Sequence, residues 1–138
     1  MKNLNLDDTA MRAALRDARI IAVVGHSDKA HRTSYRIAQF LRAVGYSVYP
    51  VNPTVDIIDG EKSYASLADL PETPDIVNVF RRSEHLTGIV DDAIAVGVKT
   101  IWTQPGVIDE VAQSNALTAR LSIAMNRCIK VEHQCLGV

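Results

Sequence analysis

IIAVVGHSDKAHRTS, at residues 20–34, combines three local signals. The apolar run Ile20–Val24 has the length of a buried strand and ends at Gly25. A polar, basic loop then leads to Thr33 and Ser34, where an amphipathic helix is expected to begin. This order favours an anion site, because glycine lets the backbone approach a ligand and the first N–H groups of the helix point at it. We therefore predict a phosphate-binding loop for a nucleotide-type ligand.

The sequence on both sides of this loop alternates between strand and helix patterns. Helices are predicted over residues 7–18, from Thr33 or Ser34 to Gly45, from Ser83 (as N-cap) to Gly97, and over 110–119 with Asp109 as N-cap. Strands are predicted over 20–24, 46–51, 75–80, 99–103 and 121–125. Residues 54–74 are expected to be irregular apart from a helical turn around 66–70, and residues 127–134 fit a helical turn or an edge strand. The predicted fold is α/β: a doubly wound, mostly parallel, five-stranded Rossmann-like sheet with helices on both faces.

Length and composition indicate one domain over residues 1–138, with an N-terminal helix within 1–18 and a Rossmann-like core over 19–134. The net charge of −1, without a basic and aromatic cluster, argues against a nucleic-acid partner. No apolar run approaches the roughly 20 residues of a membrane span, and the N-terminus lacks the apolar core of a signal peptide. We expect a cytoplasmic protein with reduced Cys128 and Cys135. The sequence leaves open whether the protein forms a homodimer.

The residues in the first turn and at the end of the second strand indicate which kind of nucleotide is bound. The turn has one glycine, Gly25, with Ser27 two residues later, and the second strand ends in Val51, Asn52 and Pro53 without a carboxylate for a ribose. Both features disfavour NAD, and no P-loop motif occurs. The loop is instead rich in hydroxyls and cations, which suit a ligand with more phosphate charge, such as coenzyme A (CoA); its cations are Lys29, His31, Arg32 and, one turn into the helix, Arg36.

Five segments occur in a fixed order: VVGHSDKAHRTSYRIAQFL, YPVNP, DIVNVFRR, TIWTQPGVI and MNRCIKVEH. Together they resemble the small stand-alone CoA-binding proteins, which share their fold with the CoA-binding domain of the succinyl-CoA synthetase α subunit. The resemblance extends from about Ile20 to His133. It implies a Rossmann-like CoA-binding domain without the other domains that make the synthetase an enzyme.

The resemblance also implies which residues bind the cofactor. It places Gly25, His26 and Ser27 at the phosphates with Arg32 and Ser34 closing over them, Val51, Asn52 and Pro53 beside the adenosine, Phe80, Arg81 and Arg82 at the next strand end, Gln104, Pro105 and Gly106 along the pantetheine, and Cys128 near the thiol. Two positions depart from the family's pattern. His26 stands where a small residue is commoner and Pro105 where an aliphatic one is, and both changes bear on affinity rather than on fold.

We expect a binding protein for CoA or an acyl-CoA rather than an enzyme, because no Ser-His-Asp or Cys-His set is recognisable. Cys128, His133 and Cys135 make an incomplete zinc set, so no metal is expected. Two alternatives stay open. One is an enzyme, either an NAD(P)-dependent reductase or one that transforms acyl-CoA. The other is an interaction module that has kept the fold and lost the ligand.

Overall fold

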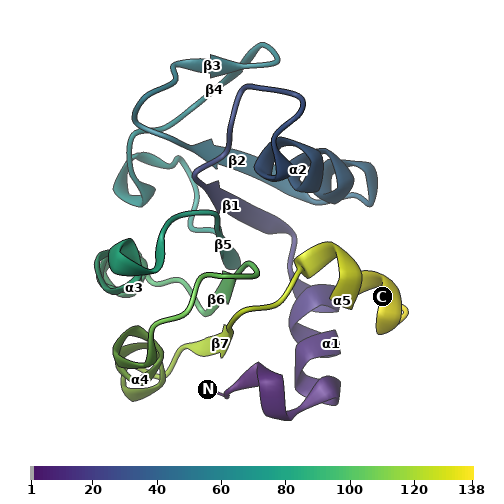
Figure 1. Ribbon diagram of the computed structural model, residues 1–138, viewed down its shortest axis with the longest axis vertical. Coiled ribbons are helices and arrows are strands. Elements are labelled where there is room, and N and C mark those ends of the chain that lie inside the picture. The colour runs from purple at the N-terminus through teal and green to yellow at the C-terminus, as the bar shows by residue number, and fades with distance from the viewer. Residues whose placement is uncertain (1) are drawn as a thin grey trace.

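A parallel five-stranded sheet forms the centre of the computed structural model, which describes residues 2–138 (Figure 1). The strands are β1 (Ile20–Val24), β2 (Ser47–Val51), β5 (Ile76–Val79), β6 (Thr100–Thr103) and β7 (Ser122–Ala124), in the order β2-β1-β5-β6-β7. The predicted Rossmann-like α/β class is confirmed. Because the chain passes from β1 to β2 on one side and later returns to β5 on the other, the topological switch point lies between β1 and β5.

Helices cover both faces of this sheet. One face carries α1 (Asp8–Asp17), α2 (Thr33–Ala43) and α5 (Ile129–Cys135), and the other carries α3 (Leu86–Val96) and α4 (Glu110–Thr118) (Figure 1). Successive side chains of a strand point to opposite faces of the sheet. Ile21 and Val23 of β1 therefore pack in the core beneath α1, α2 and α5, whereas Ala22 and Val24 pack in the core beneath α3 and α4. Burial on both faces explains why β1 is apolar without interruption.

The start of α3 differs from the prediction. A 3-10 turn, η3 (Ser83–His85), comes first, and Ser83 does not cap the helix. Its hydroxyl donates to the Gly106 carbonyl at 3.2 Å and accepts from the Ile108 N–H at 2.8 Å. Ser83 therefore joins the loop after β5 to the loop after β6. In contrast, Asp109 caps α4 as predicted, accepting from the Ala112 N–H.

The remaining parts of the chain form short elements. The stretch predicted as irregular contains a small antiparallel hairpin, β3 (Ile57–Ile58) and β4 (Glu61–Lys62), and the expected helical turn, η2 (Leu67–Asp69). The C-terminal segment, left open between two structures, is the helix α5. A further turn, η1 (Leu4–Leu6), precedes α1. Within residues 2–138, every helix is too short or too polar to cross a lipid bilayer.

Candidate functional site

Gly25 forms a tight turn where β1, β2 and β5 end. Its φ of +88° is one that L side chains rarely adopt, and its N–H donates to the Val51 carbonyl at 2.8 Å. A Cβ at this position would clash with the Phe80 carbonyl oxygen. The close approach that requires glycine is therefore one between two loops of the protein, and it holds the β1 loop against the end of β5.

The loop after Gly25 leads to an uncapped helix N-terminus. Arg32 occupies the N-cap position of α2 and makes no side-chain hydrogen bond there, and the first turn contains no acidic residue. The loop is fixed from within: the Ser27 N–H donates to the buried Ser34 hydroxyl at 2.9 Å, and the Lys29 N–H donates to the Ser27 hydroxyl at 3.0 Å. The first N–H groups of α2 thus lack a side-chain partner beside two exposed cations, Lys29 and Arg32.

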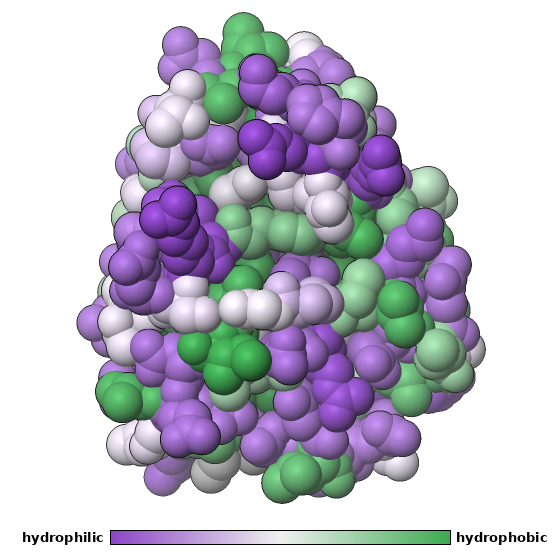
Figure 2. Space-filling view, in the orientation of Figure 1, coloured by the Kyte–Doolittle hydropathy of each residue, from purple (hydrophilic) through white to green (hydrophobic). Residues whose placement is uncertain are grey.

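Three neighbouring hollows lie at the carboxyl ends of the strands, and the middle of this face is visibly recessed (Figure 2). The loop hollow, of about 470 Å³, is lined by Gly25, Ser27, Asp28, Lys29, Arg32, Thr33, Ser34, Asn52, Thr54, Val55 and Phe80. The β2 hollow, of about 250 Å³, is lined by Val24, Val51, Pro53, Ala65, Ser66, Leu67, Arg81, His85, Gly88, Ile89 and Asp92. The β6 hollow, of about 660 Å³, is lined by Thr33, Phe80, Arg81, Arg82, Gln104, Pro105, Gly106, Val107 and Cys128.

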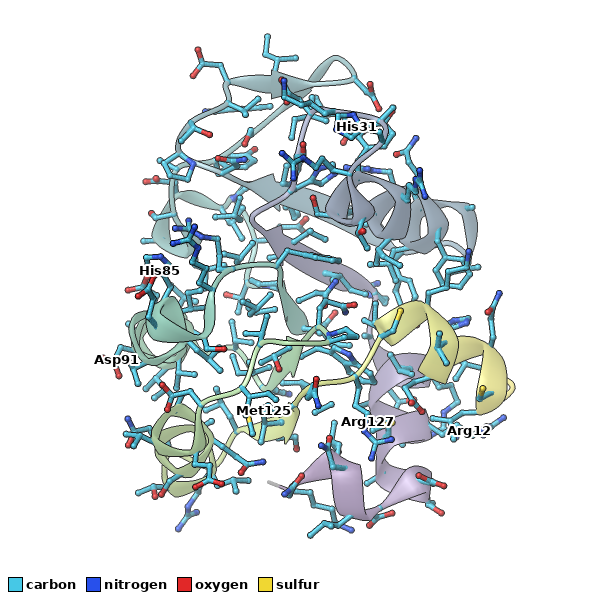
Figure 3. All side chains as sticks on the ribbon, in the orientation of Figure 1. Arg12, His31, His85, Asp91, Met125 and Arg127 are labelled. Atoms are coloured by element: carbon cyan, nitrogen blue, oxygen red, sulfur yellow. The ribbon has the colours of Figure 1, made fainter. Side chains whose placement is uncertain are left out.

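The hollows adjoin one another through three residues that they share. Phe80 and Thr33 line both the loop hollow and the β6 hollow, and Arg81 lines both the β2 hollow and the β6 hollow. His31, on the loop before α2, and His85, before α3, lie on two sides of this edge (Figure 3). Of the residues predicted for the cofactor, all but His26 and the loop cations His31 and Arg36 line one of these hollows.

The charges along this edge are mostly positive. Among residues 2–138, no ion pair or side-chain hydrogen bond engages Lys29, Arg32 or Arg81. Arg82 pairs with Glu84 at 3.8 Å, but both side chains are largely exposed, so this pair contributes little. Lys29, Arg32 and Arg81 are therefore unpaired within residues 2–138, and each lines one or two of the hollows.

His26 turns away from the hollows into the protein. It is fully buried, with Nδ1 at 2.8 Å from the Ser27 carbonyl oxygen and Nε2 at 3.2 Å from Arg42 Nη1. Because a guanidinium can only donate, Nε2 accepts and the proton of the neutral ring lies on Nδ1. Burial lowers the pKa of His26, and the nearby Arg42 charge lowers it further. The imidazole thus fixes the loop from behind and leaves the hollow in front of it unobstructed.

Asn52 ends β2 with its side chain already engaged. Its amide donates to the His26 carbonyl at 2.9 Å, and its Oδ1 accepts from the N–H and the hydroxyl of Thr54. This Asx turn shapes the loop after β2.

A buried amide pair beneath the β6 hollow was not predicted. Gln104 Nε2 donates to Asn78 Oδ1 at 2.6 Å, and both residues are buried. Among residues 2–138, the Nδ2 of Asn78 has no hydrogen-bond partner. The signal was present in the sequence as a single asparagine inside the apolar strand Ile76–Val79. The 65–67 segment and His85, which line the β2 hollow, were also missed.

A hollow of about 670 Å³ lies at the opposite edge of the sheet, between the beginning of β1 and the end of α2. His133 lines it, with its pKa lowered by burial and its ring edge-on to Phe40 and Tyr46. No group of three metal-ligating side chains occurs in the described part of the chain, and both cysteines are free.

Comparison with known proteins identifies the family of this chain. A family model described as a CoA binding domain matches residues 19–134. The chain is 36% identical over 129 residues to the uncharacterized protein YneT of Bacillus subtilis (strain 168), which covers 94% of this chain and 96% of YneT. A hypothetical protein from Pyrococcus horikoshii OT3 has a similar structure, with a TM-score of 0.93 and 33% identity over 100% of this chain and 97% of that one.

The same fold occurs as one part of a larger enzyme. The apo form of the dinucleotide forming acetyl-coenzyme A synthetase 1 of Ca. Korarchaeum cryptofilum matches with a TM-score of 0.67 and 28% identity. The match covers 75% of this chain and 25% of the synthetase, so the chain corresponds to about a quarter of that enzyme. With a family model matching more than three quarters of its length, the chain belongs to the CoA binding domain family.

Proposed function

We propose that this protein binds CoA or an acyl-CoA at the carboxyl edge of its sheet. We propose further that it is a binding protein and not an enzyme that acts on this ligand. The observation that carries the proposal is the uncapped N-terminus of α2, which opens on the loop hollow between Lys29 and Arg32. An anion there gains hydrogen bonds from free N–H groups, the favourable end of the helix dipole and two charges. The diphosphate of the cofactor is assigned to this hollow.

We assign the adenosine and the pantetheine arm of CoA to the other two hollows. The β2 hollow, between Val51, Pro53 and Leu67, is apolar at its base and fits the adenine. Arg81 lies at its border, where its free guanidinium suits the 3′-phosphate. The β6 hollow, on the other side of Phe80, takes the pantetheine arm. Each part of CoA thus has a hollow of matching chemistry, and the loop hollow meets the β6 hollow at Phe80 and Thr33.

The end of β2 supports CoA over NAD. A dinucleotide-binding sheet places a carboxylate there for the ribose diol, whereas this chain has Asn52, whose side chain is occupied by its own loop. Two observations support a binding role. The sequence contains no recognisable Ser-His-Asp or Cys-His catalytic set. The chain also matches only 25% of the synthetase.

Isothermal titration calorimetry with CoA, dephospho-CoA and NAD tests the proposal. CoA should bind, dephospho-CoA should bind more weakly because it lacks the 3′-phosphate, and NAD should bind weakly or not at all. Arg32→Ala should weaken CoA binding by about 1.5–3 kcal/mol, the contribution of a charged hydrogen bond.

Arg19→Ala is the matched control, because Arg19 is an exposed arginine directly before β1, at the opposite edge. Its CoA affinity should equal that of the unmodified protein. Absence of CoA binding, or an equal loss in both arginine variants, would contradict the proposal and favour an interaction module without a ligand.

A further inference from the structure

The β6 hollow contains a thiol in a fixed position. Cys128 is half-buried and lines this hollow with Phe80 and Gln104. The residue before it is held at both backbone groups: the Arg127 N–H donates to the Thr103 carbonyl at 3.0 Å, and the Arg127 carbonyl accepts from the Trp102 indole at 2.9 Å. Figure 3 shows Arg127 on the segment between β7 and α5. Cys128 is therefore tied to β6.

The hollow also offers an open hydrogen-bond acceptor, independent of the cysteine. Gln104 is only 3% exposed, and its Nε2 is used by Asn78. Among residues 2–138 its amide oxygen has no hydrogen-bond partner, although it is not one of the fully enclosed atoms. Because Gln104 and Cys128 both line the β6 hollow, we take this unengaged oxygen to be open to the space that they share. A buried amide acceptor left open in a hollow indicates a ligand with a donor, and the pantetheine arm carries two amide N–H groups.

We propose that Cys128 reacts with the disulfide form of CoA and retains one CoA as a mixed disulfide. This inference rests on the proposed function, because the diphosphate in the loop hollow directs the arm past Phe80 towards Cys128. In the reaction the Cys128 thiolate attacks one sulfur of CoA disulfide, and a new bond forms between Sγ and that CoA. The disulfide bond of the reagent breaks, and the second CoA leaves as a thiolate that takes up the proton lost by Cys128. One disulfide is consumed and one is formed, so no other oxidant is needed.

The second cysteine of the chain makes this proposal specific. Cys135 is exposed at the end of α5 and lines none of the three hollows. Access alone would favour reaction at Cys135, because exposed thiols exchange more readily than covered ones. Docking of the CoA portion reverses this preference by holding the disulfide beside Cys128.

The test uses the reduced, full-length protein with CoA disulfide and reads the adduct by intact-mass and peptide mass spectrometry. The protein and Cys135→Ser should each gain the mass of one CoA less two hydrogen atoms, at Cys128. The reaction at Cys128 should be at least about tenfold faster than at Cys135. S-methyl-CoA, whose thioether cannot exchange, should slow it. Glutathione disulfide, which lacks the nucleotide, should show no preference for Cys128.

Cys128→Ser should form no adduct in the hollow and should fold, because serine is favoured at the N-cap position that Cys128 occupies on α5. Faster reaction at Cys135, or no effect of S-methyl-CoA, would overturn the inference. Calorimetry of CoA with Cys128→Ser separates the two proposals. If CoA binds this variant while the unmodified protein forms no adduct, the covalent step is wrong and the proposed function stands. If CoA binds neither protein, both are wrong.

Discussion

Helices α2 and α4 follow parallel strands and so begin at the same edge of the sheet, but their first turns differ. Asp109 caps α4, and Glu110 adds a negative charge at the positive end of its dipole. The start of α2 has neither, and an arginine occupies its N-cap position. An aspartate cap contributes about 1 kcal/mol, and a cation at this end is unfavourable. The first turn of α4 is therefore completed by its own side chains, whereas we propose that the first turn of α2 is completed by a bound phosphate.

The largest expected effect comes from removing the turn that carries α2's loop. Gly25→Ala places a Cβ against the Phe80 carbonyl oxygen at a positive φ, and we expect it to lower the free energy of unfolding by about 3 kcal/mol or more. Gly45→Ala is the control, because Gly45 also has a positive φ but no atom near the added Cβ. It should cost only about 1–2 kcal/mol in urea denaturation. Equal losses in the two variants would show that the contact with Phe80 does not matter.

Making α2 resemble α4 should separate stability from binding. Arg32→Asp supplies an N-cap and removes a cation, so we expect the free protein to gain about 0.5–1 kcal/mol in the free energy of unfolding. CoA binding should weaken by at least about 2 kcal/mol, because the carboxylate replaces and repels the phosphate. Urea denaturation and calorimetry measure the two quantities. A variant that gains stability and still binds CoA with unchanged affinity would refute the role of this helix start.

The reciprocal change, Asp109→Ala, should affect stability alone. The variant loses the hydrogen bond to the Ala112 N–H, and the expected cost is about 1 kcal/mol in the free energy of unfolding. CoA affinity, measured in the folded range of the same samples, should not change. A clear loss of affinity would mean that the beginning of α4 belongs to the site as well.

The smallest effect concerns pH and the imidazole behind the α2 loop. Burial holds the pKa of His26 below that of an unfolded histidine, which is about 6.5. Between the two values the unfolded chain binds more protons, so the free energy of unfolding should fall as the pH drops through about 6.5. His26→Gln should flatten this dependence in urea denaturation at a series of pH values. An unchanged slope would show that His26 is protonated equally in both states.

Most of the fold could be predicted because its signals are local and repeated. Five strand-length apolar runs alternate with helix patterns, and glycines such as Gly97 end the helices as expected. The β3–β4 hairpin was missed because each strand has only two residues, although Asp59 and Gly60 form a typical hairpin turn. Ser83 was wrongly assigned as a cap, since its partners Gly106 and Ile108 come from a loop far along the chain.

The site was harder to predict than the fold because side-chain direction depends on tertiary packing. The sequence identified the loops that meet at the carboxyl edge, and the predicted residues line the hollows there, apart from His26, His31 and Arg36. The orientation of the His26 side chain could not be predicted, because its partner Arg42 lies 16 residues further along the chain, on α2. Their contact depends on how α2 packs beside the loop. The hydrogen bond between Asn78 and Gln104 likewise depends on the pairing of β5 with β6.

A crystal structure of the protein soaked with CoA would show where the diphosphate binds. We predict that it lies in the loop hollow, within hydrogen-bonding distance of the first N–H groups of α2, with the Arg32 side chain turned towards it. A diphosphate bound elsewhere, for example in the hollow beside His133, or a loop hollow left empty at saturating CoA, would contradict it.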